Sequence, residues 1–305
     1  MRFLEAISQR TVDIFKHQNE KIILQCLAAQ RNEYDCAKEM NFYKLVANIA
    51  LAGFMCVAFY FDTDELVSLS VLASVITLVY CKNNDRERAK TKKDAAAIQQ
   101  YIDANLYSGL LGKDINIWGN LPSKTVISEA VARVGNTYDE NLKNWYTKCE
   151  SDIVEYQIFS CQRQNINWEK DLREEYIKYQ WIVLFFFGVV ALIIFFHGDY
   201  SFVKAISFSS SLLSVFDFVY TNNSCVNDDM KRLEEIKRKW LDWEKIILCG
   251  GKKQKLELLI EMQDCIRENR ENAYLLPNWF YNLKKDRNHK REENISKAIK
   301  DIDDD

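Results

Sequence analysis

A polar stretch near the middle of the chain combines amides, an indole ring and cations. Its candidate ligand-binding residues are Arg163, Asn165, Trp168 and Arg173. Such groups suit a nucleotide, because amides recognise base edges, aromatic rings stack on bases and arginine pairs with phosphate. The alternative is a polar contact between helices inside a folded domain, which composition alone favours. On an ideal helix Asn165, Trp168 and Arg173 do not share one narrow face, so we do not expect all three to contact one small ligand.

The signatures of common catalytic sites are missing from the sequence. It contains no glycine-rich phosphate loop, no nucleophile elbow and no HExxH zinc motif. His17, His197 and His289 are isolated, and the nine cysteines form no CxxC pair. Neither a histidine-based triad nor a zinc site can therefore be assembled from the sequence. We expect that the protein is not an enzyme and has no catalytic residue, no bound metal and no resident cofactor. We also expect its cysteines to be reduced thiols.

Two long apolar stretches interrupt the charged chain. The first covers 43–81 and breaks only at 62–65, and the second covers 179–221 and breaks only at 197–200. Each contains two segments of roughly 16 to 21 residues, close to the length with which a helix crosses the hydrocarbon core of a bilayer. Only 2 prolines and 9 glycines occur in 305 residues, which favours long helices over strands. We expect an all-α membrane protein with four transmembrane helices in two hairpins.

The hairpins divide the polar remainder into three blocks, which we expect to form a helical cytosolic domain. The resulting division is an amphipathic segment 1–42, hairpin 43–81, a helical region 82–178, hairpin 179–221 and a helical C-terminal region 222–305.

Within the polar blocks, local signals set the expected helix boundaries. Ser123 is placed to cap one helix, and another helix is expected from about Asp139 to Lys178. The pair Gly250 and Gly251 is expected to separate two further helices. The charged tail after Asn288 is expected to fray.

The distribution of charge predicts how the spans are oriented. Cationic residues flank both hairpins on the side of the polar blocks, whereas the turns at 62–65 and 197–200 carry acidic residues. Because lysine and arginine mark the cytoplasmic side of membrane helices, we expect both termini in the cytoplasm and two very short external turns. A competing interpretation makes 66–81 a short buried helix, which would reverse the charge bias. The net charge of −3 provides no basic field for DNA or RNA.

Hydroxyl groups recur along one face of two predicted spans. They are Ser70, Ser74 and Thr77 in the second span, and Ser207, Ser211 and Ser214, followed by Asp217, in the fourth. One interpretation is close helix packing, because small residues let backbones approach. The other is a polar pore wall formed when several chains assemble. The serines alone favour packing, whereas an ionisable residue within a span usually faces a partner or a cavity.

Short motifs spread along the chain carry a resemblance to a known family. They are Gln18-Asn19-Glu20, Leu27 to Arg31 with Tyr34 and Lys38, Ala95 to Gln99 with Asp103, Asn144-Trp145-Tyr146, Cys161 to Asn165 with Trp168, Leu172-Arg173 and Tyr176, and Arg270 followed by Leu276 to Tyr281. In their order around two hairpins they resemble the SMODS-associated four-transmembrane effectors, described as pore-forming proteins of bacterial antiphage systems of the CBASS type. No residue of that family is carried over as catalytic.

The resemblance implies a role in antiphage signalling at the bacterial inner membrane. A partner nucleotidyltransferase would make a cyclic oligonucleotide during infection, and the effector would then compromise the membrane and cause abortive infection. Our hypothesis is a homo-oligomeric pore in the lipid bilayer that is gated by this ligand. Two alternatives are a constitutive small channel or transporter, and a membrane-anchored cytosolic scaffold or sensor.

Overall fold

The computed structural model describes residues 13–61, 63–135, 138–149, 151, 153–197 and 202–304, and the side chains of 191–215 are among those it leaves undescribed. This part of the chain is helical and contains no strand. The elements are α1 (Ile14–His17), α2 (Lys21–Phe61), α3 (Asp64–Leu111), η1 (Ile115–Trp118), α4 (Lys124–Val134), η2 (Glu140–Leu142), α5 (Val154–His197), α6 (Phe202–Cys249), α7 (Lys252–Asn272) and α8 (Asn278–Asp304).

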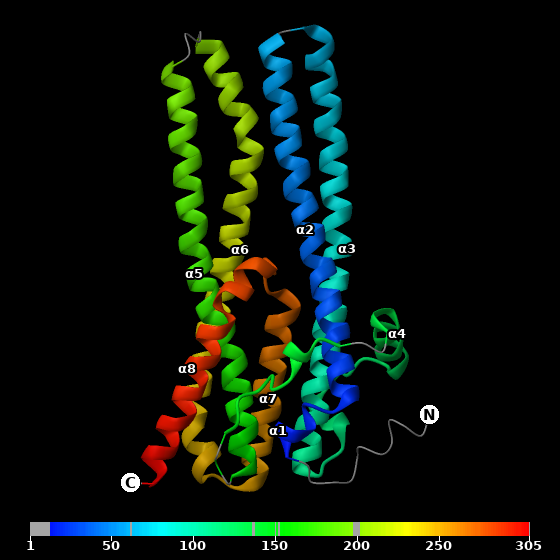
Figure 1. Cartoon of the computed structure of the whole chain (residues 1–305), viewed down its shortest axis with the longest axis vertical. Helices are drawn as coiled ribbons and strands as arrows, with labels where there is room; N and C mark the ends of the chain where they lie inside the picture. Colours follow the sequence, from blue (N-terminus) through cyan, green and yellow to red (C-terminus); the bar gives the residue numbers. More distant parts are fainter. Residues whose placement is uncertain are drawn as a thin grey trace.

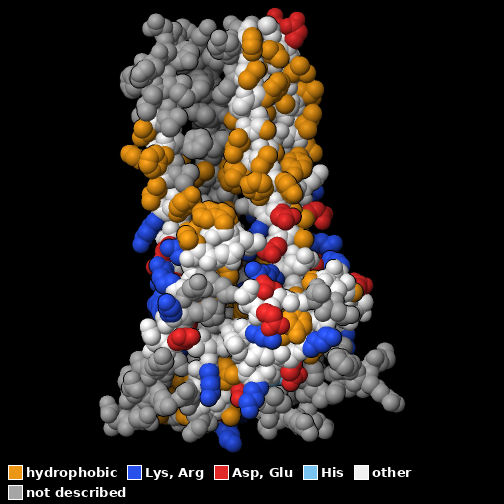
Figure 2. Space-filling model, viewed as in Figure 1, with side chains coloured by type: hydrophobic (Ala, Val, Ile, Leu, Met, Phe, Trp, Pro, Cys, Tyr) orange, Lys and Arg blue, Asp and Glu red, His pale blue; other side chains and the backbone are white. Residues whose placement is uncertain are grey.

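Four long helices form two antiparallel hairpins, α2 with α3 and α5 with α6, which stand side by side and project from a wider base (Figure 1). The projecting part carries mainly hydrophobic side chains where these are described, and the base carries the charges (Figure 2). On α3 the apolar residues are openly exposed, as at Val71 and Ile76, each 60% exposed. An unpaired apolar surface of this extent is typical of a lipid or protein contact.

Within the described residues, α3 contains a segment long and apolar enough to cross a membrane. Its 18-residue window has a mean hydropathy of 1.6, and only 6% of that window is buried. Because the described residues form only helices, they support the prediction of an all-α chain. The full count of four spans stays a prediction.

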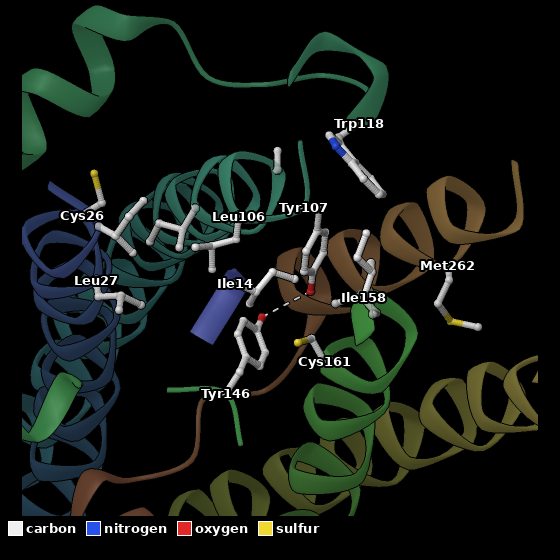
Figure 3. Close-up of a cluster of buried hydrophobic side chains, with 14 of the residues drawn as sticks. Ile14, Cys26, Leu27, Leu106, Tyr107, Trp118, Tyr146, Ile158, Cys161 and Met262 are labelled. Atoms are coloured by element: carbon white, nitrogen blue, oxygen red, sulfur yellow. Dashed lines mark hydrogen bonds between the residues drawn. The ribbon is translucent and has the colours of Figure 1, made fainter. Parts of the chain in front are cut away.

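The base is one helical domain assembled from all three polar blocks. Its core joins Ile14 and Leu27 from the first block, Leu106 and Ile158 from the second, and Met262 from the third (Figure 3). A smaller apolar cluster lies closer to the hairpins and contains Leu172, Tyr176, Val226, Tyr274, Leu276 and Phe280. The core clusters thus fix the two helix pairs at the ends that lie in the base.

Several helix ends follow from local chemistry as predicted. The hydroxyl of Ser123 accepts a hydrogen bond from the backbone N–H of Val126 at 3.4 Å and caps α4. At the other end of a helix, Gly112 adopts φ 59° and closes α3, a conformation that suits glycine. The break at Gly250 and Gly251 is also confirmed, because α6 ends at Cys249 and α7 begins at Lys252.

The predicted start of a helix near Asp139 is wrong, because α5 begins only at Val154. Side-chain amides from elsewhere bind the backbone that a helix would have used. The N–H of Tyr146 donates to Gln18 Oε1 at 2.7 Å, and the N–H of Thr147 donates to Gln164 Oε1 at 2.9 Å. Asn144 is held at φ 55°. Tertiary hydrogen bonds therefore override the local helical pattern.

The tail after Asn288 is helical rather than frayed, since α8 continues to Asp304. Ion pairs hold α8 against α5. Lys284 and Arg287 both pair with Glu175, and Arg291 pairs with Asp171. These contacts supply the tertiary support that an isolated charged helix lacks.

Candidate functional site

A cavity of about 180 Å³ lies in the upper part of the base, below the hairpins. Most of its lining comes from α2, α5 and α7 and from residues 273–281, which connect α7 to α8 and form the first turn of α8. Gln99 of α3 and Leu233 and Ile236 of α6 also line it. Residues 141–145, which precede α5, form a further part of the wall. The cavity therefore lies where all three polar blocks meet.

Helix α5 presents one continuous face to the cavity. Asn165, Trp168, Glu169, Leu172 and Arg173 line it, at the spacing of neighbours on one helical stripe. Three of the four predicted ligand residues thus reach the same cavity. Asn165, Trp168 and Arg173 line this cavity along two turns of α5. The expectation that they do not all contact one small ligand stays a prediction.

Arg163, the fourth predicted residue, lies outside the cavity lining. Its guanidinium lies 5.9 Å from the ring centroid of Trp240 and 3.8 Å from the carboxylate of Glu292. Burial raises the pKa of Glu292, although Arg163 opposes this. Arg163 therefore ties α5 to α6 and α8 in the structure.

Arg173 joins the cavity wall to a buried ionic network. Its Nε donates to Asp229 Oδ2 on α6 at 2.9 Å, and its Nη2 donates to the carbonyl oxygen of Tyr274 at 3.1 Å. Asp229 also accepts from the N–H of Tyr274 at 2.6 Å and pairs with Arg232, and Glu169 pairs with Arg173. One guanidinium thus connects α5, α6 and the α7–α8 segment.

Two buried polar atoms of α7 residues that line the cavity have no hydrogen-bond partner among the described residues. They are Oδ1 of Asn269 and Nη2 of Arg270, in side chains that are 4% and 7% exposed. Both residues line the cavity. Unpaired buried polar atoms are rare and costly in folded proteins. A donor and an acceptor on adjacent residues at a cavity wall are an arrangement that a polar ligand would satisfy.

The other side of Arg270 is firmly held. Its Nη1 donates to Asp103 Oδ2 at 2.6 Å, and Asp103 Oδ1 accepts from the hydroxyl of Tyr146 at 2.7 Å. Asn165 Nδ2 donates to the same Tyr146 hydroxyl at 3.0 Å. Burial raises the pKa of Tyr146 well above its usual value, so this phenol stays a hydrogen-bond donor. The network fixes Asn165 and Arg270 relative to each other before any ligand arrives.

Aromatic rings and further cations complete the wall. Trp145 and Trp168 pack edge to face with ring centroids 6.3 Å apart, and Tyr34 and Tyr281 also line the cavity. Lys38 Nζ donates to Asn278 Oδ1 at 2.5 Å, and burial lowers the pKa of this lysine. Cationic residues outnumber acidic ones among the lining residues, with Arg31, Lys38, Lys143, Arg173 and Arg270 against Asp35 and Glu169.

The predicted pore-lining residues occupy different environments in this single chain. Ser70 is buried at 7% exposure, while Ser74 and Thr77 are half-buried on an otherwise exposed part of α3. The hydroxyl of Ser74 donates to the carbonyl oxygen of Val71 at 2.7 Å. Asp217 is exposed in the first third of α6. The side chains of Ser207, Ser211 and Ser214 lie outside the described residues.

Reasoning from the sequence missed the cavity residues contributed by α2, α7 and α8. A usable signal was present, because Arg31, Tyr34, Lys38, Arg270 and Tyr281 all belong to the motifs that carry the family resemblance. These motifs are far apart in the sequence and meet around one cavity. Only the fold reveals that meeting point.

The described residues contain no group of three or more His, Cys, Asp or Glu side chains that could hold a metal ion. No curated protein and no solved structure matches the sequence. A model of the SMODS-associating 4TM effector domain matches residues 12–302, and the chain therefore belongs to this family of membrane effectors.

Proposed function

We propose that this chain is a membrane effector of antiphage defence that is switched by a cyclic oligonucleotide bound in the cavity between α2, α5 and α7. The family description names an effector that associates with SMODS. In this proposal a SMODS-type nucleotidyltransferase is the partner that makes the ligand. Permeabilisation of the inner membrane by an oligomer then causes abortive infection.

The observation that carries the proposal is the unsatisfied pair at Asn269 Oδ1 and Arg270 Nη2 inside a cationic and aromatic cavity. A purine edge offers both donors and acceptors, and side chains with amide and guanidinium groups recognise such edges in nucleic acids. The indole of Trp168 offers a surface for stacking. Arg173 and Lys38 offer positive charge for phosphate groups.

The size of the cavity supports a change of conformation on binding. Sites that enclose drug-sized ligands have volumes of about 300–1,000 Å³, whereas this cavity has about 180 Å³. A cyclic oligonucleotide would have to widen it by moving a wall. Such a ligand binds the widened state better than the resting state, and this difference in affinity is what allows a ligand to shift a conformational equilibrium.

Arg173 offers a route from the ligand to the spans. A phosphate at its guanidinium would compete with Glu169 and Asp229 for the same donors. Asp229 lies on α6, eight positions beyond the predicted end of the fourth span at Thr221. Loosening the link between Arg173 and Asp229 would let α6 move relative to α5. In an oligomer, the faces with Ser70, Ser74, Thr77, Ser207, Ser211 and Ser214 would then line a pore, and Asp217 would favour cations.

The decisive experiment measures dye leakage from liposomes that contain the purified full-length chain, with and without a panel of cyclic dinucleotides and trinucleotides. We expect leakage with one nucleotide and little without it. Leakage that is equal under all conditions would favour the constitutive channel or transporter. Nucleotide binding without leakage would favour the membrane-anchored sensor.

A matched pair of variants tests the site. Asn269→Leu removes the unpaired acceptor at similar volume, so the fold should keep its stability while nucleotide affinity falls by about tenfold or more. Arg238→Gln changes an exposed cation of α6 outside the cavity lining and should leave affinity unchanged. Equal affinity of Asn269→Leu and the unmodified chain, measured by calorimetry in detergent, would exclude this cavity as the site.

A second pair of variants tests the proposed pore wall. Asp217→Ala and Ser214→Leu should reduce nucleotide-dependent leakage while nucleotide binding remains intact, because both changes remove polar groups from the proposed lumen. Unchanged leakage in both variants would show that α6 does not line the pore.

A further inference from the structure

Residues 273–283, which connect α7 to α8 and form the first turns of α8, have an inner face and an outer face. On the inner face Tyr274, Leu276 and Phe280 are buried in the apolar cluster beneath the hairpins. On the outer face Trp279 is 51% exposed and Leu283 is 68% exposed. Large apolar side chains are therefore exposed on the outer face, although the side chains of the inner face are fully packed in the core.

The outer face lies at the lower boundary of the hairpins. The ring of Trp279 packs edge to face on Tyr179, with centroids 5.2 Å apart, and Tyr179 begins the third predicted span. Above it, Trp181, Ile182 and Phe185 are each more than half exposed on α5. Figure 1 places the segment at the foot of the hairpins, where Figure 2 shows hydrophobic side chains above a charged surface.

Along α8 the exposed side chains change from apolar to cationic, which is the order expected for a helix that leaves a membrane surface. Trp279 and Leu283 come first, and the exposed cations Arg287 and Lys290 follow farther from the spans. Tryptophan and tyrosine are enriched at the interface between membrane and water, and cations next to such an anchor are attracted by anionic headgroups.

We propose that Trp279 and Leu283 sit in the interfacial layer of the bilayer, beside the point where α5 enters it. The occupant of this apolar face is thus lipid, because the face continues the apolar surface of α5 through the contact of Trp279 with Tyr179. The proposal rests on the membrane placement of the spans and is independent of ligand gating.

This contact gives the cavity a wall that touches the membrane. Leu276, Asn278 and Tyr281 line the cavity, and Trp279 projects from the same first turn of α8. A ligand that moves this wall also moves the lipid contact. By reciprocity, the lipid environment of Trp279 then influences ligand affinity.

The test measures tryptophan fluorescence of the full chain in phosphatidylcholine and phosphatidylglycerol vesicles whose phosphatidylcholine carries brominated acyl chains. No nucleotide is needed. Trp279→Phe should lower the fraction of emission that the bromolipid quenches, because it removes a residue in contact with lipid. Trp243→Phe, which changes a partly buried ring of the core far from the hairpins, should leave the quenchable fraction unchanged or raise it. Circular dichroism verifies that both variants are folded.

An equal quenchable fraction in Trp279→Phe and the unmodified chain would overturn the proposal. If Trp279→Phe also reduced the size of the particle in solution, the outer face would instead be a contact between copies of the chain. Failure of nucleotide-dependent leakage would leave this measurement unaffected, so the two proposals fail separately.

Discussion

Arg173 combines a structural role with a position at the cavity wall. It is almost fully buried and shares Asp229 with the backbone of Tyr274. Removing one partner of a buried ion pair leaves an uncompensated charge, which costs about 3–5 kcal/mol. A loss of ligand binding in a single Arg173 variant would therefore not distinguish a ligand contact from a damaged fold.

A double substitution separates these two roles. Arg173→Met and Asp229→Leu should each lower the unfolding temperature in detergent, and the double variant should recover much of the loss because no buried charge is left unpaired. If Arg173 binds ligand phosphate, the recovered double variant should still bind nucleotide weakly. Full affinity in that variant would show that Arg173 only supports the fold.

Lys92 provides a pH-dependent contribution to stability. It lies on α3 and its Nζ donates to the carbonyl oxygen of Ala273 at 3.0 Å, while burial lowers its pKa from 10.5 to about 8. Between these values the unfolded chain binds more protons than the folded chain. The free energy of unfolding contributed by Lys92 therefore rises from about pH 8 to about pH 10.5.

Comparison with Lys92→Met isolates this contribution from cysteines and tyrosines that titrate in the same range. Relative to the variant, the unmodified chain should gain stability on the order of 1–2 kcal/mol as the pH rises through this window, after allowance for solvent screening. Thermal unfolding at several pH values measures the difference. A difference that is constant with pH would mean that Lys92 titrates normally.

At the scale of elements, the hairpin formed by α2 and α3 explains why Ser70 is buried. Ala52 and Ala58 on α2 are also buried, and small residues let two helices approach closely in a membrane. Two polar contacts also join α2 to α3 nearer the base. Asn48 contacts Cys81, and Lys44 pairs with Asp85 at 2.8 Å. In the single chain, Ser70 therefore occupies a packing position.

Enlarging this position should disturb the hairpin. Ser70→Leu should destabilise the chain by about 1–3 kcal/mol through overpacking, whereas Val71→Leu, at an adjacent exposed position, should be close to neutral. The unfolding temperature in detergent or nanodiscs measures both. If the two variants behave alike, α2 and α3 do not pack through Ser70, and a role for this residue in an oligomeric pore gains support.

Element boundaries were predictable from the sequence where local chemistry sets them. The Ser123 cap and the break at Gly250 are local signals of this kind. The start of α5 was not predictable, because Gln18 and Gln164 reach the backbone of residues 146–147 only after the chain has folded. The same holds for the cavity. Its α5 wall could be read from residue types, whereas the contributions of Tyr34 and Arg270 depend on packing between distant segments.

At the scale of the whole molecule, most of the charged side chains that Figure 2 shows lie at one end of the hairpins. Only two residues separate α2 from α3, and one of them, Thr63, is exposed. So small a turn offers no room for a ligand site at this end of the α2–α3 hairpin. If the ligand binds in the cavity, as we propose, the orientation of the base decides from which compartment the ligand comes.

Thiol labelling tests this orientation. Cys225 and Cys249 are exposed on the base, and Thr63→Cys places a thiol at the opposite end. Because cations flank the base side of the hairpins, a membrane-impermeant maleimide should label Thr63→Cys in intact bacterial cells with a permeable outer membrane. It should label Cys249 only in inverted inner-membrane vesicles. Mass spectrometry of the labelled peptides separates the sites. Labelling of Cys249 in intact cells would place the base outside, and a cyclic nucleotide made in the cytoplasm could then not reach the cavity.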